Sequence, residues 1–302
     1  MTKILIVGAN GFVGRRILEK LSQMKDYQVY ACSRGKDIRP ALKYQFTQID
    51  LSNLAEFKTY IESITPDVII NAAALSSPQE CQNNTITAMR INVEAVREMS
   101  NYTEQNEKYL IHLSTDFVFS GNRKRLYAED DEKDPQNYYG ETKSKSEDML
   151  LNTEGRYAIA RIEVVFGEHY PGQHGNIFTL VRNNLQKGLK VQVVNDQYRT
   201  PTFVDDVVWG VEALIRKQPT GIFHFAGPEY LSIADFAYRI ARFFQLDESL
   251  IESVSSRQMC DTIRRPRYSG LSIKKSRKIL GYNPGSIAKA LNIISTPQSK
   301  IY

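Results

Sequence analysis

The chain begins with a short apolar run that is followed at once by a glycine-rich segment. This feature constrains the fold more than any other. The run Ile4–Val7 has the length and composition of a buried strand, and the segment Gly8–Gly14 leads from it into a helix-like stretch. Glycines at such a turn let backbone N–H groups and the helix N-terminus approach a pyrophosphate. The spacing is Gly-x-x-Gly-x-x-Gly, and a tight connection without a ligand is the alternative for this pattern alone.

Short apolar runs alternate with amphipathic, helix-length stretches through the first half of the chain. The strand-like runs are Lys3–Val7, Gln28–Cys32, Val68–Asn71, Tyr109–Leu113 and Tyr157–Ile162. The helix-like stretches between them include Val13–Met24 and Ala88–Glu104. Continuous apolar strands joined by helices indicate a parallel sheet that is covered on both faces. We therefore expect an α/β fold, with a Rossmann-like, doubly wound parallel sheet and a smaller C-terminal substrate-binding domain.

The regular alternation weakens after Phe166, and we place a domain boundary there. Residues 1–166 are expected to form a nucleotide-binding Rossmann domain, and residues 167–302 mainly a substrate-binding domain with some elements returning to the main sheet. The elements expected in the second part are helices at Ile177–Lys187, Val204–Arg216 and Ala234–Phe244 and strands at Val191–Val194 and Ile222–Phe225. Two loops, Gly121–Gln136 and Glu168–Asn176, are expected to border a cleft.

Composition argues against several classes of protein. No apolar run approaches the ~20 residues that cross a bilayer, so no membrane partner is expected. The net charge of +5 is spread among interspersed acids and bases, except near residues 264–278, which argues against nucleic acid and favours an anionic small molecule. Cys32, Cys81 and Cys260 are odd in number and far apart, which argues against a disulfide framework and favours a cytoplasmic location. The four histidines are scattered, and no metal site is predicted.

Tyr139 and Lys143 stand four residues apart in a helix-like stretch and so share one helical face. We expect the Lys143 charge to favour the ionised form of Tyr139 and to lower its pKa from the usual value of about 10. A phenol tuned in this way passes a proton to a carbonyl oxygen as hydride arrives at the carbon. A Tyr-x-x-x-Lys pair also occurs by chance, so its meaning depends on the segments that precede it.

A polar group follows the apolar run Tyr109–Leu113. Ser114, Thr115 and Asp116 stand at the carboxyl end of the expected strand, where open α/β sheets bind ligands. We expect Thr115 to hydrogen-bond a substrate carbonyl; the alternative is that Ser114 or Asp116 only caps the end of the strand. A glycine loop, a strand-end threonine and a Tyr–Lys pair in this order indicate a reductase.

The end of the second strand indicates which cofactor is bound. An acidic residue there would hold the ribose of NAD, whereas this chain has Ser33-Arg34 with Lys36 nearby. An arginine pairs with a 2′-phosphate, so NADP(H) is preferred, and NAD(H) remains the alternative if Arg34 is a solvated loop charge. The predicted cofactor contacts are Gly8, Asn10, Gly11, Phe12, Val13, Gly14, Ser33, Arg34, Asp50, Leu51, Ala72, Ala73, Ala74, Ser114, Tyr139 and Lys143.

These features together resemble the extended short-chain dehydrogenase/reductase superfamily, and several segments are most similar to the dTDP-4-dehydrorhamnose reductase family. The similarity spans nearly the whole chain. The matching segments are Gly8–Gly14, Asn71–Ala74, Ser114–Gly121, Tyr139–Lys143, Asp196–Thr202, Arg265-Pro266 and Ser269-Gly270-Leu271. The resemblance implies that Thr115, Tyr139 and Lys143 form a catalytic triad in which Tyr139 donates the proton.

The resemblance also implies a substrate and a reaction. The expected reaction is NADPH-dependent reduction of the 4-keto group of a nucleotide-linked 6-deoxyhexose, in deoxysugar and polysaccharide biosynthesis. Thr115, Asp116, Phe117, Arg199 and Arg265 are the expected substrate contacts, and the alternative for each arginine is a pair with a surface carboxylate. A homodimer is the default assembly. The alternative functions are a nucleotide-sugar epimerase or dehydratase of the same superfamily and a non-catalytic NADP-binding regulatory subunit.

One segment departs from the family pattern. Where the family usually reads Arg-Thr-Ser-Trp-Val-Tyr-Gly, this chain has Arg161-Ile162-Glu163-Val164-Val165-Phe166-Gly167. A tryptophan face and a valine present very different apolar areas to a ligand. The identity of the sugar, and of the nucleotide attached to it, is therefore left open by the sequence.

Overall fold

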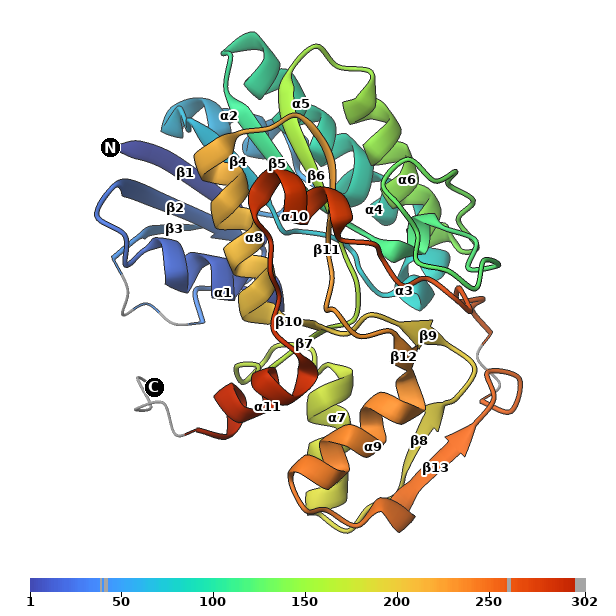
Figure 1. Cartoon of the computed structure of the whole chain (residues 1–302). Helices are drawn as coiled ribbons and strands as arrows, with labels where there is room; N and C mark the ends of the chain where they lie inside the picture. The colour runs from blue at the N-terminus through green and yellow to red at the C-terminus, as the bar shows by residue number, and fades with distance from the viewer. Residues whose placement is uncertain (39, 41–42, 260–261, 297–302) are drawn as a thin grey trace.

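The computed structural model describes residues 1–38, 40, 43–259 and 262–296. Its centre is a parallel sheet of seven strands in the order β11-β6-β5-β4-β1-β2-β3 (Figure 1). The strands are β1 (Thr2–Val7), β2 (Tyr27–Ser33), β3 (Gln45–Gln48), β4 (Val68–Asn71), β5 (Tyr109–Thr115), β6 (Arg156–Ile162) and β11 (Gly221–Phe225). The order reverses at β1, which pairs with β2 on one side and β4 on the other. This confirms the doubly wound sheet, and ligands bind such sheets at the point of reversal.

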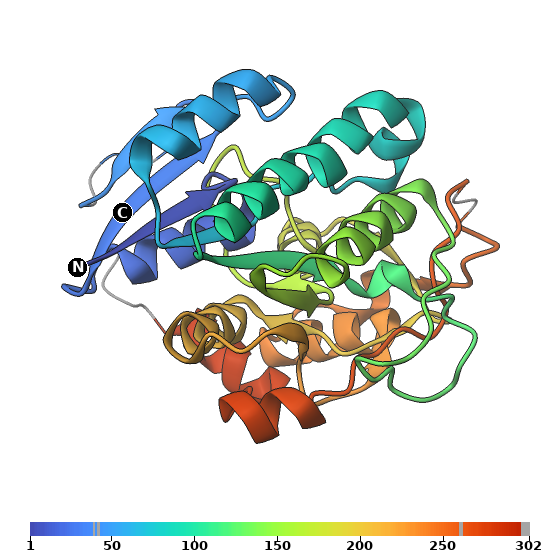
Figure 2. The ribbon, with the colours of Figure 1, turned by 90° about the horizontal axis from the view of Figure 1, so that it is seen from above.

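Helices cover both faces of the sheet (Figure 2). One face carries α2 (Leu54–Ile64), α5 (Ala95–Gln105) and α6 (Tyr138–Leu151), and the other carries α1 (Phe12–Leu21), α8 (Val204–Lys217) and α10 (Lys274–Leu280). Strand β1 shows how the sequence produces this arrangement. Leu5 and Val7 pack with α2 and α5, whereas Ile4 and Ile6 pack with α1 and α8. Successive strand side chains point to opposite faces, so a run that is apolar throughout is buried on both sides.

A second, smaller core lies below the sheet in the view of Figure 1. Its elements are α7 (Ile177–Gln186), α9 (Ile233–Phe243), α11 (Ile287–Ser295) and the parallel pair β8 (Val191–Val194) and β13 (Ile251–Val254). Two of its helices begin with capping boxes, formed by Asn176 and Thr179 at α7 and by Ser232 and Asp235 at α9. These caps satisfy backbone N–H groups that the helix itself leaves without partners.

The chain passes between the two cores more than once. After the smaller core has begun, α8 and β11 return to the sheet, and β11 pairs with β6. Short strand pairs form along the way: β7 (Val165–Phe166) with β10 (Thr202–Phe203), and β9 (Tyr198–Arg199) with β12 (Leu231–Ser232). Figure 1 places these short strands between the sheet and the smaller core. The remaining elements are α3 (Pro78–Asn83), α4 (Thr85–Met89), η1 (Arg90–Glu94), η2 (Asp116–Val118) and η3 (Glu248–Leu250).

The helix expected over Ala88–Glu104 is interrupted in the structure. Helix α4 ends at Met89, a π-helical turn covers Arg90–Glu94, and α5 follows. The buried side chain of Asn92 lies in this turn and donates to Thr142 Oγ1 at 2.9 Å. It also accepts from the Leu75 backbone N–H at 2.8 Å. The wider turn therefore directs a polar side chain to helix α6, a contact that sequence periodicity does not reveal.

The structure also bears on membrane spans, metal sites and the state of the cysteines. Among the described residues, no helix has the length and apolar character needed to span a bilayer. The same residues include no group of three or more His, Cys, Asp or Glu side chains that could hold a metal ion. Cys32 and Cys81 are buried free thiols, and Cys260 lies outside the described residues.

Candidate active site

The glycine loop is packed so closely that side chains at two of its positions would collide with backbone. Gly8 has a φ of +82°, and a Cβ there would lie 2.6 Å from the Ala73 nitrogen. A Cβ on Gly14 would lie 2.3 Å from the Gly8 carbonyl oxygen. Gly11 is the N-cap of α1, and no side chain caps the first turn of that helix. The N–H groups of this turn are therefore in place to receive an anion.

A cavity of about 930 Å³ extends from this loop to the C-terminal end of β5 and the N-terminal end of α6. The predicted site residues on its wall are Asn10, Gly11, Phe12, Val13, Ser33, Arg34, Ala72, Ala73, Ala74, Ser114, Thr115, Asp116, Phe117, Tyr139, Lys143 and Arg265. Gly8, Asp50 and Leu51 line an adjoining cavity of about 240 Å³. Most of the predicted residues thus share one cleft, whereas Gly14 is a packing position behind the loop.

Three residues of the loop 168–176 also line this cleft, although the sequence did not single them out. Gly172, Gln173 and His174 lie on the wall of the larger cavity. The Gln173 side-chain amide donates to the Asn10 carbonyl oxygen at 2.9 Å, and the Asn10 amide donates to the Lys36 carbonyl oxygen at 2.8 Å. Asn10 therefore links the glycine loop to the segment that carries Arg34. The only sequence signal for these residues was that the loop Glu168–Asn176 was expected to border a cleft.

The cleft fits a dinucleotide that carries a 2′-phosphate. The glycine turn and the small side chains of Ala72–Ala74 allow a ligand close to the backbone. Arg34 and Lys36 both line the larger cavity. Hydrogen bonds from Ser52 and the charge of Arg34 lower the pKa of Asp50, so the guanidinium lies beside the predicted adenine contact. Two cationic side chains at this edge match an added phosphate.

Thr115 and Tyr139 come together because η2 and α6 pack in close contact. A Cβ on Gly140 would lie 2.3 Å from the Phe117 carbonyl oxygen, so the helix needs glycine to approach this turn. The Asn137 side chain caps α6 by accepting from the Gly140 N–H at 2.9 Å. The rings of Phe117 and Tyr139 meet edge to face, with centroids 5.8 Å apart. The Thr115 hydroxyl then lies close enough to the Tyr139 phenol to affect its pKa.

The expectation that Lys143 lowers the pKa of Tyr139 is wrong for this arrangement. The Lys143 side chain is buried at the wall of the cleft, and its amine donates to the Leu113 carbonyl oxygen at 2.7 Å and lies 3.0 Å from His112 Nε2. Desolvation of the phenol and the nearby Asp116 raise the pKa of Tyr139, and the neighbouring Thr115 hydroxyl offsets this in part. Burial lowers the pKa of Lys143 to about 7. The helical spacing places both residues on one wall but does not bring their polar atoms together.

His112 is a partner of Lys143 that the sequence did not identify. Asn71 Oδ1 accepts from the Ala73 N–H at 3.0 Å, so its amide nitrogen donates to His112 Nδ1 at 3.1 Å. The ring proton of the neutral imidazole is then on Nε2, which faces Ser146 Oγ at 3.1 Å and Lys143 Nζ. Burial and the neighbouring lysine hold the pKa of His112 well below its usual range. Ser146 Oγ uses its own proton on the Lys143 carbonyl oxygen at 2.8 Å, so it accepts the Nε2–H of His112.

Arg199 was expected to bind an anionic group or to pair with a surface carboxylate, and the structure places it among buried carboxyl groups and on the wall of a cavity that Val164 and Val165 also line. Its guanidinium is buried, and Nε lies 3.6 Å from Asp116 Oδ2 and 3.8 Å from Glu163 Oε1. Its remaining nitrogens donate to carbonyl oxygens, among them that of Pro266 at 2.5 Å. Arg199 therefore holds the segment that carries Arg265, which itself lines the cleft. Glu163 was missed, although it lies in the segment that departs from the family pattern.

A further cavity of about 360 Å³ adjoins the main cleft. Phe117, Val164, Val165 and Arg265 line both, so the two spaces meet at these residues. Val164, at the position of the family's tryptophan, has a φ of +38°. A β-branched residue rarely adopts this left-handed backbone, and such strain is frequent beside ligand sites.

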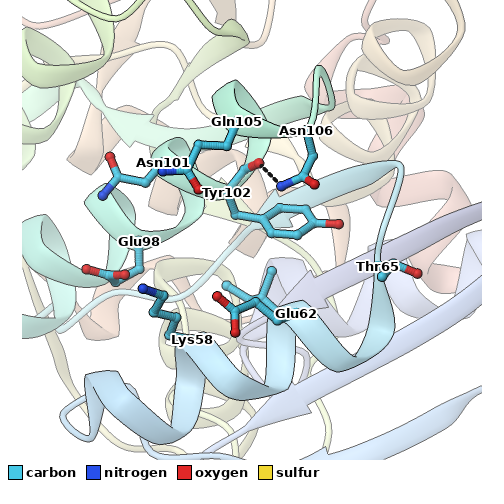
Figure 3. A pocket seen from close by; sticks show the side chains of 9 residues that line it. Lys58, Glu62, Thr65, Glu98, Asn101, Tyr102, Gln105 and Asn106 are labelled. Atoms are coloured by element: carbon cyan, nitrogen blue, oxygen red, sulfur yellow. Dashed lines mark hydrogen bonds between the residues drawn. The ribbon is translucent and has the colours of Figure 1, made fainter.

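A separate polar hollow of about 300 Å³ lies between α2 and α5 (Figure 3). Lys58 and Glu62 line it from α2, and Glu98, Asn101 and Tyr102 line it from α5. It shares no lining residue with the cavity at the glycine loop. We therefore assign it no part in the candidate active site.

Comparison with known proteins identifies relatives along the whole chain. Residues 1–297 match the model of the family described as RmlD substrate binding domain. A dTDP-4-dehydrorhamnose reductase from Aggregatibacter actinomycetemcomitans is 29% identical over 97% of this chain and 98% of its own length. Methionine adenosyltransferase 2 subunit beta from Danio rerio is 27% identical over 90% of this chain and 83% of its own length.

Solved structures show the same fold. A dTDP-4-dehydrorhamnose reductase from Clostridium acetobutylicum is 26% identical and superposes with a TM-score of 0.84, covering 97% of this chain and 98% of that one. A dTDP-4-dehydrorhamnose reductase from Bacillus anthracis, solved in complex with NADP, is 22% identical and superposes with a TM-score of 0.82, covering 97% of this chain and 99% of that one. The Rossmann-like architecture predicted from the sequence is confirmed.

Proposed function

Because the chain belongs to the RmlD substrate binding domain family, we propose that it is an NADPH-dependent reductase of the 4-keto group of a nucleotide-linked 6-deoxyhexose. One observation carries the proposal: Thr115, Tyr139 and Lys143 lie on the wall of the cavity that begins at the glycine loop. The relative from A. actinomycetemcomitans, which is a dTDP-4-dehydrorhamnose reductase, supports the choice of substrate class.

Three residues are proposed to act on the reacting groups. When bound, the nicotinamide cofactor supplies the hydride. Tyr139 donates a proton to the carbonyl oxygen, and its raised pKa keeps the phenol protonated at neutral pH. Thr115 orients the carbonyl from the end of β5. Lys143, with a pKa of about 7, holds the nicotinamide ribose and changes protonation near neutrality.

The remaining predicted residues are proposed to bind. The glycine loop receives the pyrophosphate, Arg34 with Lys36 receives the 2′-phosphate, and Asp50 with Leu51 flanks the adenine. Phe117 and Arg265 lie where the two cavities meet, which suits contact with the nucleotide-sugar and its diphosphate. In this proposal residues 1–166 are the NAD(P)-binding domain and 167–302 mainly the substrate-binding domain.

The proposal also covers the assembly of the protein and its location in the cell. We propose a homodimer, because closed two-fold dimers are the commonest assembly of soluble proteins. We also propose that the protein acts in the cytoplasm, where its two buried free thiols remain reduced. Size-exclusion chromatography with light scattering checks the first, and fractionation of cells that express the protein checks the second.

Replacing Arg34 by alanine is expected to raise the Kd for NADPH by about 10- to 100-fold, because a charged hydrogen bond contributes roughly 1.5–3 kcal/mol. The Kd for NADH, which lacks the 2′-phosphate, should change by no more than about twofold. Titration of each reduced cofactor by its fluorescence measures both values. Arg97→Ala, at an exposed arginine of α5, is the matched control. Equal weakening of both cofactors would contradict the role assigned to Arg34.

The reaction itself is tested by supplying dTDP-4-keto-6-deoxy-L-mannose, generated in place, with NADPH and in parallel with NADH. Rapid oxidation of NADPH with formation of a dTDP-rhamnose product is expected. An epimerase or dehydratase of the superfamily recycles its cofactor and would consume no net NADPH. No oxidation with any 4-keto-6-deoxy nucleotide-sugar would contradict the proposal.

The similarity to methionine adenosyltransferase 2 subunit beta favours one second candidate, a cofactor-binding regulatory subunit. Such a protein would bind NADPH, turn over no keto-sugar and co-purify with an unrelated enzyme. The presence of Thr115, Tyr139 and Lys143 together on the cavity wall favours the reductase.

A further inference from the structure

Two carboxyl groups and one guanidinium share a buried site behind Thr115. Asp116, Glu163 and Arg199 are 3%, 1% and 2% exposed, and we call these three residues the carboxyl cluster. Arg199 Nε lies 3.6 Å from Asp116 Oδ2 and 3.8 Å from Glu163 Oε1. The cluster therefore contains two carboxyl groups but only one guanidinium, and it lies where water is largely excluded.

The Ser269 hydroxyl connects the two acids. It donates to Asp116 Oδ2 at 2.5 Å and lies 3.4 Å from Glu163 Oε1. The other oxygen of Glu163 accepts from the backbone N–H of Thr200 at 3.0 Å and from the Thr200 hydroxyl. A proton on Glu163 Oε1 would point to Ser269, whose own proton points to Asp116. One proton can thus rest on either carboxyl group without any movement of the backbone.

Charge balance requires such a proton. One guanidinium neutralises one carboxylate, and a second buried carboxylate without a partner is strongly disfavoured. Burial and the neighbouring Asp116 raise the pKa of Glu163 to about 8, and burial raises the pKa of Asp116 despite Arg199. The other titratable groups that face the cluster are Tyr139, beside Asp116, and Tyr230, beside Glu163 and Arg199. Neither phenol supplies a positive charge.

The cluster reaches the reacting groups through Thr115. The Thr115 hydroxyl donates to Asp116 Oδ1 at 3.1 Å and accepts from the Phe117 N–H at 3.2 Å. A hydroxyl has a single proton, so Thr115 cannot donate to Asp116 and to a substrate carbonyl at once. An ionised Asp116 holds this proton strongly, whereas an Asp116 that shares a proton holds it weakly.

We propose that Glu163 and Arg199 are positioning residues that hold one proton in common with Asp116 and thereby control whether the Thr115 hydroxyl is free to donate to the substrate. This inference rests on the proposed function, since Thr115 acts on a substrate only in a reductase. With the shared proton present, Thr115 turns to the carbonyl. After its loss, both carboxylates are ionised, Thr115 stays on Asp116, and negative charge opposes the developing alkoxide.

The test compares wild type with Glu163→Gln, which keeps the side-chain shape but cannot exchange the proton. In the wild type, kcat/KM for the keto-sugar should fall with a midpoint near pH 8. In Glu163→Gln, Asp116 is ionised throughout, so kcat should be about tenfold lower at pH 7. The step near pH 8 should be absent, whereas the change that Lys143 causes near pH 7 should remain. The Kd for NADPH should stay within about twofold. Asp206→Asn, a carboxyl change on α8 away from the cleft, should keep the wild-type pH profile.

A second readout is independent of activity. A carboxyl whose pKa is raised on folding keeps its proton while the unfolded chain loses it, so stability falls as pH rises from about 5 to 8. The Tm of the wild type should therefore fall by about 5 °C relative to the Tm of Glu163→Gln as the pH rises over this range. If Glu163→Gln does not fold, Ser269→Ala, which removes the connecting hydroxyl, replaces it in the kinetic test and should alter the same ionisation.

The outcomes separate this inference from the proposed function. A constant Tm difference between pH 5 and 9, or an alkaline fall in kcat/KM that persists unchanged in Glu163→Gln, would overturn it. If the wild type reduces no keto-sugar, but the Tm difference between it and Glu163→Gln still increases with pH, the proposed function is wrong. The shared proton between Asp116 and Glu163 would still be supported.

Discussion

Tyr139→Phe is expected to lower kcat by about 10²- to 10⁴-fold, because the variant loses the group that donates the proton to the carbonyl oxygen. The ring is retained, and so is its edge-to-face contact with Phe117. The Kd for NADPH should therefore change by no more than about twofold. Stopped-flow measurement of NADPH oxidation with the keto-sugar gives kcat, and fluorescence titration gives Kd.

The neighbouring tyrosine provides a matched control for this substitution. Tyr138 lies one position earlier on α6, and its hydroxyl contacts only the Thr85 carbonyl oxygen, at 3.5 Å, among the hydrogen bonds of the described residues. Tyr138→Phe removes the same atom from the same helix and should keep wild-type kcat. Unchanged turnover in Tyr139→Phe, or equal losses in the two variants, would refute the role assigned to Tyr139.

Lys143→Met is expected to lower kcat/KM by about 10²-fold or more and, at the same time, to raise stability. Activity falls because the group proposed to hold the nicotinamide ribose is lost. Stability rises because burial has lowered the pKa of Lys143 from 10.5 to about 7, so the charged lysine is disfavoured in the folded state. Each unit of this shift is worth about 1.4 kcal/mol, and we expect a gain of roughly 2–4 kcal/mol at pH 7.

The sign of the pH dependence provides an independent check. Between pH 7 and 10.5 the unfolded chain carries a charged Lys143 and the folded protein a neutral one. The unfolded state therefore binds more protons at this group, and the contribution of Lys143 to wild-type stability should rise with pH over this range. This contribution should be absent in Lys143→Met. Urea unfolding at several pH values measures it, with the exposed Lys145→Met as control. A variant that is both inactive and less stable than the wild type would contradict the account.

The features that the sequence predicts correctly depend on local pattern. The glycine loop after β1 was recognised because a strand, a turn and a helix follow one another within a few residues, and each has its own composition. The position of Thr115 at the end of β5 follows from the same reasoning, since parallel strands bring their carboxyl ends to one edge. Tyr139 reaches this edge because Asn137 starts α6 and Gly140 permits close packing.

The contacts that the sequence does not predict join residues far apart in the chain. Glu163 binds Thr200, 37 positions later, and Ser269 binds Asp116 across 153 positions. No spacing rule links such residues, so the contacts of Arg199 with two buried carboxyl groups could not be predicted from the sequence. The partner of Lys143 was missed for a related reason. Helical spacing predicts which face of the helix carries a lysine. The position of the Lys143 amine, however, depends on its contact with His112 of β5.

Tyr139 and its neighbours are proposed to reduce a keto group with hydride from NADPH. The most direct test is to supply NADPH that carries deuterium at the transferable position, together with dTDP-4-keto-6-deoxy-L-mannose, and to analyse the sugar by mass spectrometry. The account predicts a product with one deuterium at carbon 4 for each NADPH oxidised, formed by the wild type and Tyr138→Phe and about 10²- to 10⁴-fold more slowly by Tyr139→Phe. A sugar without deuterium, with the NADPH still reduced, would contradict it.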